Sequence, residues 1–403
     1  MLPLPLANIL HHKVRSALSA LGVGIGVAML ITLSGLARGS LEEVADRWGA
    51  VDADLIVYPA RWGDNIATIS GGGLSDADAD AVARLTVAGR PAVQRAVEAF
   101  IYRLEIAGQQ HNVVGVRPGD LTSLLGAGGV QKGGRIFDPD GAFRRWIEAR
   151  LATPTEEVVD ISPEELARRG GLEMIVDARL ARAAGLKVGS TVHAAGHDFK
   201  VVGIVPAGAL ARAFVPLATA QFLFNGRLGR STLLFVKLRE GVGVGAAAEA
   251  VRATRRLSAM ALGEFRGMFL SRFAIIYLYV DAVNAVTLVV AFLFILVTLY
   301  TAVIQRTREI ALLRSMGATR RFVLREVVSE SLILTACGAA AGIAIALPAG
   351  RAVEAVKPFL TVRITPEWIL LAAVVATAGG VLAALYPGWC AMRVDVSEAL
   401  TLE

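Results

Sequence analysis

The stretch AVNAVTLVVAFLFILVTLYTAVI, residues 282–304, decides the fold, because none of its 23 side chains is charged. A helix needs about 20 mainly apolar residues to cross the roughly 30 Å of hydrocarbon in a bilayer. The next stretch, QRTREIALLRSMGAT at residues 305–319, holds three arginines and a glutamate. This abrupt change predicts that a transmembrane helix ends at residue 304. The segment 273–304 is expected to contain this helix and, before it, the end of a helical stalk.

Three other apolar runs are long enough to span a membrane. Residues 17–37 contain no charge, the run at 327–350 contains Glu330 near its start, and the last run covers 369–390. A cleaved signal peptide is the alternative for the first run, but its apolar core is longer than a typical signal h-region. The sequence therefore predicts an α-helical membrane protein with four transmembrane helices.

Residues 38–272, between the first and second membrane helices, have the composition of an ordinary soluble domain. Leu55–Tyr58 is typical of a short strand, and Ser75 stands three residues before Asp78, which is the spacing of a capping box. Ser162 precedes a proline at a first helical position. These mixed strand and helix signals predict a large α+β domain inserted between membrane helices 1 and 2.

The inserted domain is expected to have two lobes and helical stalk ends. One lobe is built from the first and last segments of the domain, and the other is inserted at about residues 100–190. Residues 40–52 and 245–281 contain few helix breakers, so we expect them to extend the first and second membrane helices beyond the bilayer.

The arginines predict the orientation in the membrane. Six of them lie in the segment 305–326, and basic residues also precede the first span and follow the last. Because cytoplasmic loops carry an excess of Lys and Arg, we place 305–326 and the tail 391–403 in the cytoplasm. A helix at 1–16 is expected on the membrane surface. The large domain and the short loop 351–368 are then extracytoplasmic, and the net charge of +6 reflects topology rather than nucleic-acid binding.

The segment after residue 304 predicts a short amphipathic helix at 307–316. Ile310, Leu313 and Met316 fall on one stripe with arginines around it, and Gly317 can end the helix in a left-handed conformation. Such a helix either anchors in lipid headgroups or docks into a groove of another protein. The residues alone leave both readings open.

Residues 305–319 resemble the cytoplasmic signature of the MacB/FtsX-type family of ABC transporter permeases, the transmembrane subunits of type VII transporters. The resemblance continues through Glu330 and the glycine-rich third span, and it extends to Lys13–Leu18, Pro387–Trp389 and the tail at 396–400. It implies a multi-pass protein of the bacterial cytoplasmic (inner) membrane. It also implies that the large external segment is a MacB-like periplasmic core domain.

The resemblance further implies that an ATP-binding subunit pushes on the helix at 307–316. The residues carried over as coupling residues are Arg308, Glu309, Ile310, Leu313, Arg314, Met316 and Gly317. The chain contains no Gly-x-x-x-x-Gly-Lys-Ser/Thr sequence, so we expect ATP and Mg²⁺ on a separate ATPase dimer and no cofactor on this chain.

We expect no enzymatic activity and no catalytic residues, because no nucleophile–base arrangement stands out. We also expect no metal site. His193 and His197 are four apart, which is the spacing of a helical metal pair, but their local pattern is that of a strand. The glycine-rich stretch 126–134 has the wrong order for a phosphate-binding loop and reads as a mobile loop.

Two glycine pairs predict close helix packing. Gly22 and Gly26 in the first span, and Gly338 and Gly342 in the third, have the small-xxx-small spacing that lets helices approach closely. The alternative is that glycine is simply common in membrane helices.

Three polar residues near the spans also need a role. Glu330 is expected to form a buried ion pair with Arg325, and a functional proton or ion site is the alternative. Asp281 and Asn284 are expected near the outer membrane surface, and an intramembrane site with a transport role is the alternative.

The implied function is mechanotransmission. ATP hydrolysis by the ATPase would move the extracytoplasmic domain and drive export or extraction of a lipid, lipoprotein, peptide, haem or drug. The alternative is a signalling or scaffold subunit that regulates an extracytoplasmic enzyme or sensor. The expected partners are the cognate ATPase dimer, a second permease copy or paralogue, membrane lipid, and a periplasmic or outer-membrane protein, but no nucleic acid.

Overall fold

The computed structural model describes residues 9, 11, 13–62, 70–125, 129–131, 133–138, 141–152, 161–206, 210–254 and 256–393. The chain forms two compact units, one of Met1–Leu41 with Phe273–Glu403 and the other of Glu42–Arg272. Most of the surface helix predicted at 1–16 lies outside the described residues, and residues 13–16 form the start of the first long helix. The tail after residue 393 also lies outside them.

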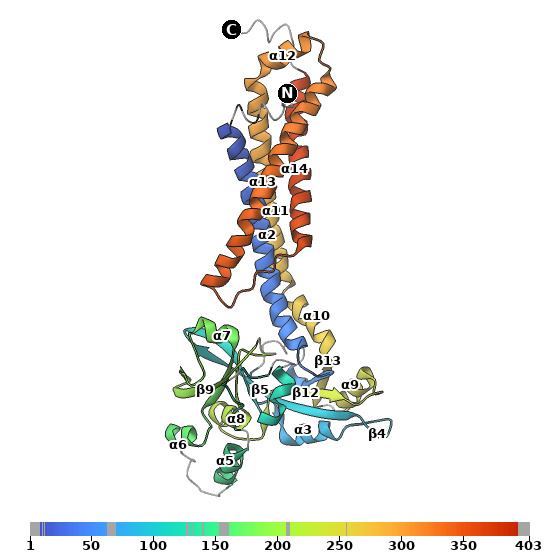
Figure 1. Ribbon diagram of the computed structural model, residues 1–403. Coiled ribbons are helices and arrows are strands. Elements are labelled where there is room, and N and C mark those ends of the chain that lie inside the picture. Colours follow the sequence, from blue (N-terminus) through green and yellow to red (C-terminus); the bar gives the residue numbers. More distant parts are fainter. Residues whose placement is uncertain are drawn as a thin grey trace. The chain divides into compact units, whose positions relative to one another are not determined.

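The first unit is a bundle of long helices (Figure 1). Among the described residues, four helices are long and apolar enough to cross a membrane: α2 (Lys13–Gly49), α11 (Ala274–Gln305), α13 (Arg320–Val356) and α14 (Pro366–Met392). The four predicted transmembrane helices are therefore confirmed. Residues of α2 after Leu41 belong to the second unit.

The two glycine pairs lie at two different helix contacts. A Cβ atom on Gly342 of α13 would lie 2.5 Å from the carbonyl oxygen of Gly24, and one on Gly338 would lie 2.7 Å from that of Ala20. Gly22 and Gly26 face α11 instead: a Cβ atom on Gly22 would lie 2.8 Å from the ring of Phe294. Glycine lets helix backbones approach to this distance, so α2 packs closely against both neighbours.

The loop between α13 and α14 crosses α2 near its outer end. Arg363 donates its backbone N–H to the carbonyl oxygen of Gly35 at 3.0 Å, and Thr361 donates its own to the Ser40 hydroxyl at 3.2 Å. A Cβ atom on Gly35 would lie 2.9 Å from the carbonyl oxygen of Arg363. The loop is therefore fastened to α2 by its backbone.

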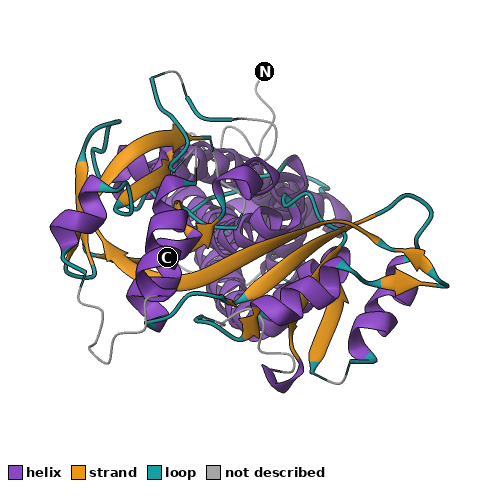
Figure 2. Cartoon of the chain, turned by 90° about the horizontal axis from the view of Figure 1, so that it is seen from below, coloured by secondary structure: helices purple, strands orange, loops and turns teal. Residues whose placement is uncertain are grey.

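The second unit is built on a mixed sheet with nine strands among the described residues (Figure 2). The order is β13-β1-β12-β5-β6-β10-β7-β9-β8. The strands are β1 (Leu55–Pro59), β5 (Val93–Ile106), β6 (Gln109–Val116), β7 (Glu173–Asp177), β8 (Thr191–Ala194), β9 (His197–Val205), β10 (Ala213–Pro216), β12 (Leu233–Leu238) and β13 (Leu257–Ala261). β5 pairs with β12 along its first part and with β6 from Phe100 onward.

Because both parts of the sheet share β5, the unit has two halves. The helices of the first half are α3 (Asp76–Ala83), α9 (Val244–Arg252) and α10 (Leu262–Arg272); those of the second are α5 (Ala142–Ala152), α6 (Pro163–Arg168), α7 (Ala178–Ala183) and α8 (Leu217–Asn225). The remaining elements are short: η1 (Ala60–Trp62), β2 (Leu74–Ser75), β3 (Thr86–Val87), β4 (Arg90–Pro91), η3 (Pro118–Asp120), α4 (Leu121–Leu125) and β11 (Arg230–Ser231). The second half includes β10 and so extends beyond the expected boundary near residue 190.

The prediction of one continuous helix over residues 245–281 is wrong. The chain there forms α9, β13 and α10, and α11 begins only at Ala274. β13 pairs antiparallel with β1 over five residues, and its Leu257 and Ala259 side chains are buried. Helix propensity is a weak preference that such tertiary pairing overrides.

Candidate coupling site

The helix after the second span is α12 (Thr307–Ser315), and its end is a Schellman motif. Gly317 has a φ of 98°, and its N–H bonds to the carbonyl oxygen of Arg314 at 3.1 Å. The N–H of Ala318 donates to the carbonyl oxygen of Leu313 at 3.0 Å. Thr319 then caps α13 through its hydroxyl. The chain thus turns sharply from α12 into the third membrane helix, as the left-handed Gly317 predicts.

The inner face of α12 packs against the membrane bundle. Ala311 is fully buried, and Ile310 is half-buried against the bundle core. Arg314 donates from Nη1 to the carbonyl oxygen of Met392 at the end of α14, at 3.4 Å. These contacts hold α12 in one place on the bundle.

An ion pair between Arg306 and Glu330 supports the start of α12. Arg306 Nη1 lies 3.3 Å from Glu330 Oε2, and both side chains are about nine-tenths buried. The prediction that Glu330 pairs with Arg325 is therefore wrong: its partner is Arg306, and Arg325 is exposed. Residues five apart on a helix do not share a face, whereas residues three or four apart do. Sequence reasoning missed Arg306 because its partner lies on another helix.

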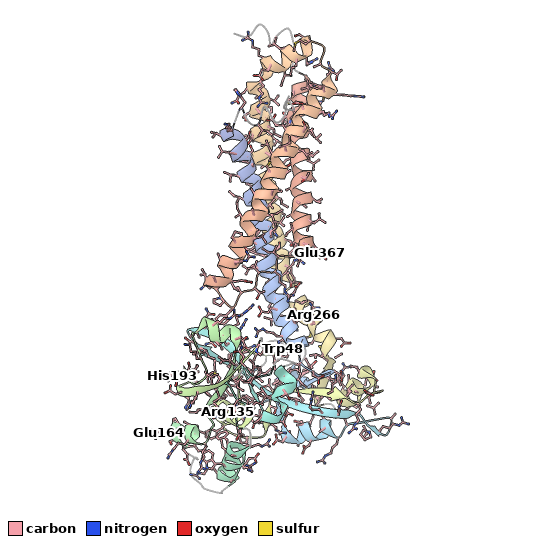
Figure 3. All side chains as sticks on the ribbon, in the orientation of Figure 1. Trp48, Arg135, Glu164, His193, Arg266 and Glu367 are labelled. Atoms are coloured by element: carbon pink, nitrogen blue, oxygen red, sulfur yellow. The ribbon has the colours of Figure 1, made fainter. Side chains whose placement is uncertain are left out.

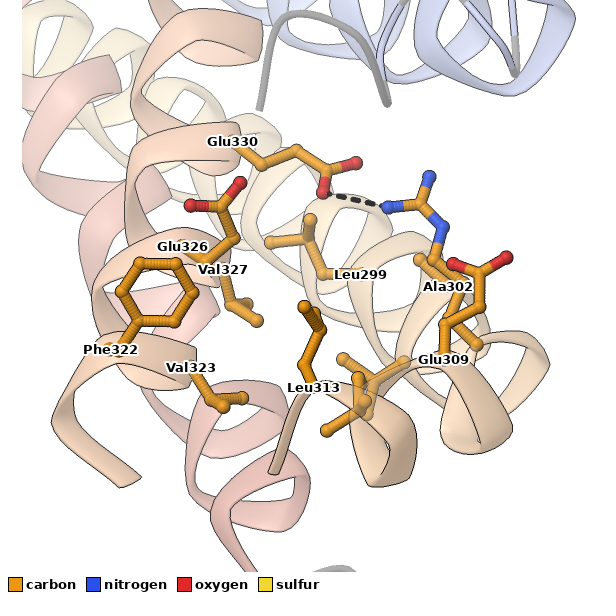
Figure 4. Close-up of a pocket in the computed structure, with 12 residues that line it drawn as sticks. Leu299, Ala302, Glu309, Leu313, Phe322, Val323, Glu326, Val327 and Glu330 are labelled. Carbon is orange, nitrogen blue, oxygen red and sulfur yellow. Dashed lines mark hydrogen bonds and ion pairs between the residues drawn. The ribbon is translucent and has the colours of Figure 1, made fainter. Parts of the chain in front are cut away.

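A pocket of about 70 Å³ lies between α11, α12 and α13 (Figure 4). Its apolar part includes Leu299, Leu313, Val323 and Val327, and its charged part consists of Arg306, Glu309, Glu326 and Glu330. Three carboxylates therefore face one guanidinium. Figure 4 shows Glu309 and Glu326 on opposite walls, which come from α12 and α13. The pocket is a local hollow under the coupling helix and is acidic.

The outer face of α12 presents Leu312 and Met316 between charged side chains. Leu312 is 48% exposed and Met316 76%, and Arg308 and Glu309 are exposed beside them. Met316 was expected on one stripe with Ile310 and Leu313, but those two are half-buried and line the pocket. Leu312 was missed by sequence reasoning. The sequence feature that could have identified Leu312 is its distance of four residues from Met316, which places both side chains on one face of a helix.

The other polar residues singled out in the sequence lie apart from this site. Asn284 is buried and donates from Nδ2 to the Ser34 hydroxyl at 2.8 Å. Asp281 is largely exposed and lies 3.8 Å from Arg38. Both contacts join α11 to α2, so the structure gives each residue a helix-packing contact near the outer end of the bundle.

Among the described residues, no group of three or more His, Cys, Asp or Glu side chains could hold a metal ion. His193 lies at the surface on β8 (Figure 3) and contacts Asp198 across the β8–β9 hairpin, with Nδ1 2.8 Å from the carboxylate. His197 pairs with Ala194 in the same hairpin. Residues 126–128 and 132 of the glycine-rich stretch lie outside the described residues.

Two family models match the chain. The MacB-like periplasmic core domain matches residues 16–254, and the FtsX-like permease C-terminal region matches residues 282–396. These are the parts of an ABC transporter permease, a multi-pass inner-membrane protein with an extracytoplasmic segment. The chain belongs to the MacB/FtsX-type family of such permeases.

Curated MacB relatives align with nearly the whole chain, and a pyoverdine export protein aligns with about a third of it. The macrolide export ATP-binding/permease protein MacB of Chlorobium luteolum is 26% identical over 98% of this chain and 59% of its own length. The MacB protein of Bdellovibrio bacteriovorus is 22% identical over 97% of this chain and 60% of its own length. The pyoverdine export protein PvdT of Pseudomonas syringae is 32% identical over 31% of this chain and 19% of its own length. The chain thus spans about three fifths of the length of the MacB relatives.

Two solved structures are similar to part of the chain. The periplasmic region of MacB from Actinobacillus actinomycetemcomitans covers 54% of this chain and 93% of its own, with 12% identity and a TM-score of 0.36. The extracellular domain of YknZ, a noncanonic ABC-type transporter from Gram-positive bacteria, covers 52% of this chain and 98% of its own, with 15% identity and a TM-score of 0.34.

Proposed function

We propose that the chain couples an ABC-type ATPase to movement of its extracytoplasmic domain, and that α12 is where the ATPase docks. The observation that carries this proposal is the difference between the two faces of α12. Its inner face packs on the bundle through Ala311, the Arg306–Glu330 ion pair holds its start, and its outer face exposes Leu312 and Met316 among charges. A helix that only anchored in headgroups would turn its whole apolar face toward lipid, whereas Ile310, Ala311 and Leu313 are turned toward the bundle.

The attachments of α12 distribute any force that reaches it. Arg306 joins α11 to α12 and is ion-paired to α13, and Arg314 bonds to the end of α14. A push on α12 would therefore be shared by three membrane helices. Packed elements of this kind move as discrete bodies rather than deform continuously. This is the property that mechanotransmission requires.

The interior of the bundle favours transmission over a conduit through the spans. Two hydroxyl groups buried in α13 are engaged with backbone: Ser331 donates to the carbonyl oxygen of Gly380 at 2.7 Å, and Thr335 donates to the carbonyl oxygen of Ser331 at 2.9 Å. A polar substrate path would need polar side chains facing a continuous cavity. We infer that the substrate is handled by the extracytoplasmic domain.

We infer that ATP and Mg²⁺ are bound by a cognate ATPase dimer on separate chains. A second permease copy or paralogue would then supply the matching half of the membrane assembly. The work done is export or extraction of a lipid, lipoprotein, peptide, haem or drug. A periplasmic or outer-membrane partner would receive the cargo.

Affinity purification of the full chain in mild detergent, followed by an ATP hydrolysis assay, tests the proposal. We expect an ABC-type ATPase to co-purify, and we expect Met316→Glu and Leu312→Glu to reduce its recovery several-fold. Val356→Glu is the matched control, because Val356 is also 76% exposed but lies at the other end of α13. The proposal fails if no ATPase is recovered with the wild type, or if the three variants behave alike.

A further inference from the structure

A second cavity lies inside the membrane unit, between α2, α11 and α14, apart from the coupling site. Its volume is about 200 Å³. None of its lining residues has a polar side chain; they are Val23, Gly26, Val27, Leu288, Val289, Ala291, Phe292, Ile295, Val375, Ala376, Gly379 and Gly380. The cavity is therefore wholly apolar.

The cavity lies at mid-membrane depth. Val27, Leu293 and Gly379 fall near the middle of the three apolar runs that form α2, α11 and α14, and the first and last of these residues line the cavity. In a bilayer roughly 30 Å thick, this is the depth at which the ends of acyl chains from both leaflets meet.

The cavity is buried at its floor and exposed at one edge, on α11. Its floor is buried, with Val27 at 2% and Ala376 at 7% exposure, whereas Val289 at the rim is 56% exposed. The exposed neighbours of two lining residues are also apolar: Val290 follows Val289 on α11, and Val374 precedes Val375 on α14. In a membrane such a surface faces hydrocarbon, so the opening connects the cavity with the lipid phase.

Gly379 leaves this space open and is not needed for helix contact. A Cβ atom on Gly379 would have no other atom within 4 Å, in contrast to Gly342, where it would meet the backbone of α2. A glycine inside a helix costs about 1 kcal/mol relative to alanine. A larger apolar side chain at position 379 would enter the cavity without straining the helix.

The chemistry of the cavity selects its occupant. Water needs two to four polar partners to be stable in a cavity, and an ion needs a countercharge. A flexible hydrocarbon chain fills an irregular apolar void and gains dispersion contacts along its length. We propose that this cavity is a binding site for one acyl chain of a membrane phospholipid, whose terminal part enters at the exposed edge beside Val289. This site does not depend on the coupling function.

Photocrosslinking in nanodiscs tests the site in the full-length chain. The probes are two phosphatidylcholines, one with a diazirine near the end of an acyl chain and one with a diazirine next to the glycerol. We expect the chain-end probe to label peptides that contain residues 288–295 and 375–380 several-fold more than peptides from other exposed parts of α11 and α14. The glycerol-side probe is expected to show no such preference.

Gly379→Leu should fill the cavity and reduce the labelling of these peptides several-fold. Ala378→Leu is the matched control, because Ala378 is the adjacent residue on α14 and is exposed; its labelling should equal that of the wild type. Uniform labelling along both helices, or equal labelling in the two variants, would overturn the proposal. Disulfide formation between two copies of a Val289→Cys variant would also overturn the proposal, since a second copy would then cover the opening.

Discussion

Arg47 and Asp177, which lie 130 residues apart in the sequence, form a buried ion pair in the second unit (Glu42–Arg272), which is the external unit of the protein. Arg47 Nη2 is 3.1 Å from Asp177 Oδ2, and the Asp177 side chain is completely buried. The other carboxylate oxygen of Asp177 accepts from the N–H of Leu180 at 2.6 Å and caps α7. One carboxylate thus joins the end of α2 to a helix of the inserted half.

Further charged groups complete this network. Arg212 lies 3.3 Å from the Asp177 carboxylate and 3.4 Å from that of Glu43, and Glu43 also pairs with Arg47 and Arg179. Burial lowers the pKa of Arg212, and the neighbouring Arg47 acts in the same direction. A buried network of this kind is costly to break because a charge is left without its partner. It therefore specifies how α2 meets the inserted half.

We expect Asp177→Ala to lower the free energy of unfolding of the external unit by about 3–5 kcal/mol, the range for removing one partner of a buried ion pair. The substitution removes two arginine contacts and the cap of α7. Urea-dependent proteolysis of the full chain in detergent measures the change. Asp52→Ala is the control, because Asp52 is 57% exposed and its ion pairs with Arg95 and Lys237 lie at the surface, where such pairs contribute at most about 1 kcal/mol each. Equal losses in the two variants would contradict the structural role of the network.

We expect the external unit to lose stability as the pH falls below about 6.5, in part because of His111. Burial of His111, together with the Arg212 guanidinium, lowers the pKa of this imidazole below its ordinary value of 6.5, while Asp177 acts in the opposite sense. The unfolded chain then binds the proton at higher pH than the folded chain. Stability is fully present above the unfolded pKa and declines as the pH falls through the folded one. His111→Gln should flatten this part of the profile, and an unchanged slope would show that other groups cause it.

We expect Gly342→Ala to destabilise the membrane unit by about 1–3 kcal/mol, the usual cost of overpacking. The added Cβ atom would lie 2.5 Å from the carbonyl oxygen of Gly24, so α2 and α13 would have to move apart. Gly379→Ala, in open space, should be neutral or stabilise by up to about 1 kcal/mol. Thermal unfolding of both variants in the same detergent measures the difference. A stabilising effect of alanine at both positions would show that glycine 342 is not required for the helix contact.

We expect Arg306→Ala to loosen α12, with a loss of about 3 kcal/mol, the lower end of the range for a broken buried pair. The lower end applies because Glu330 retains another interaction. Hydrogen exchange of peptides covering α12 should become faster, and ATPase stimulation should fall. Arg325→Ala, at an exposed position, should change neither. Similar exchange in the two variants would mean that Arg306 does not support the helix.

Features that depend on neighbouring residues were predictable from the sequence. Ser75 and Asp78 form the expected capping box, and the Ser162 hydroxyl accepts from the N–H of Glu165. The four spans follow from apolar runs of sufficient length with at most one charge near an end. In each case the signal lies within one turn or one continuous run, so no long-range contact is needed to read it.

The candidate site was only partly predictable. The position of α12 and the left-handed Gly317 follow from the local pattern. The assignment of Glu330 to Arg325 was wrong, and Leu312 was overlooked, because the inner and outer faces of a short helix depend on what packs against it. The sequence shows which residues are charged but not which of them pair with one another.

The amino-acid sequence by itself determined the number of membrane helices, their places in the chain and the short basic helix between the second and third, since composition and helical period decide these locally. Tertiary structure alone decided that β13 joins β1, that Arg306 meets Glu330, that Arg47 meets Asp177, and that Gly379 borders an open cavity. Each of these depends on residues from separate elements, and only the packing of those elements brings them together.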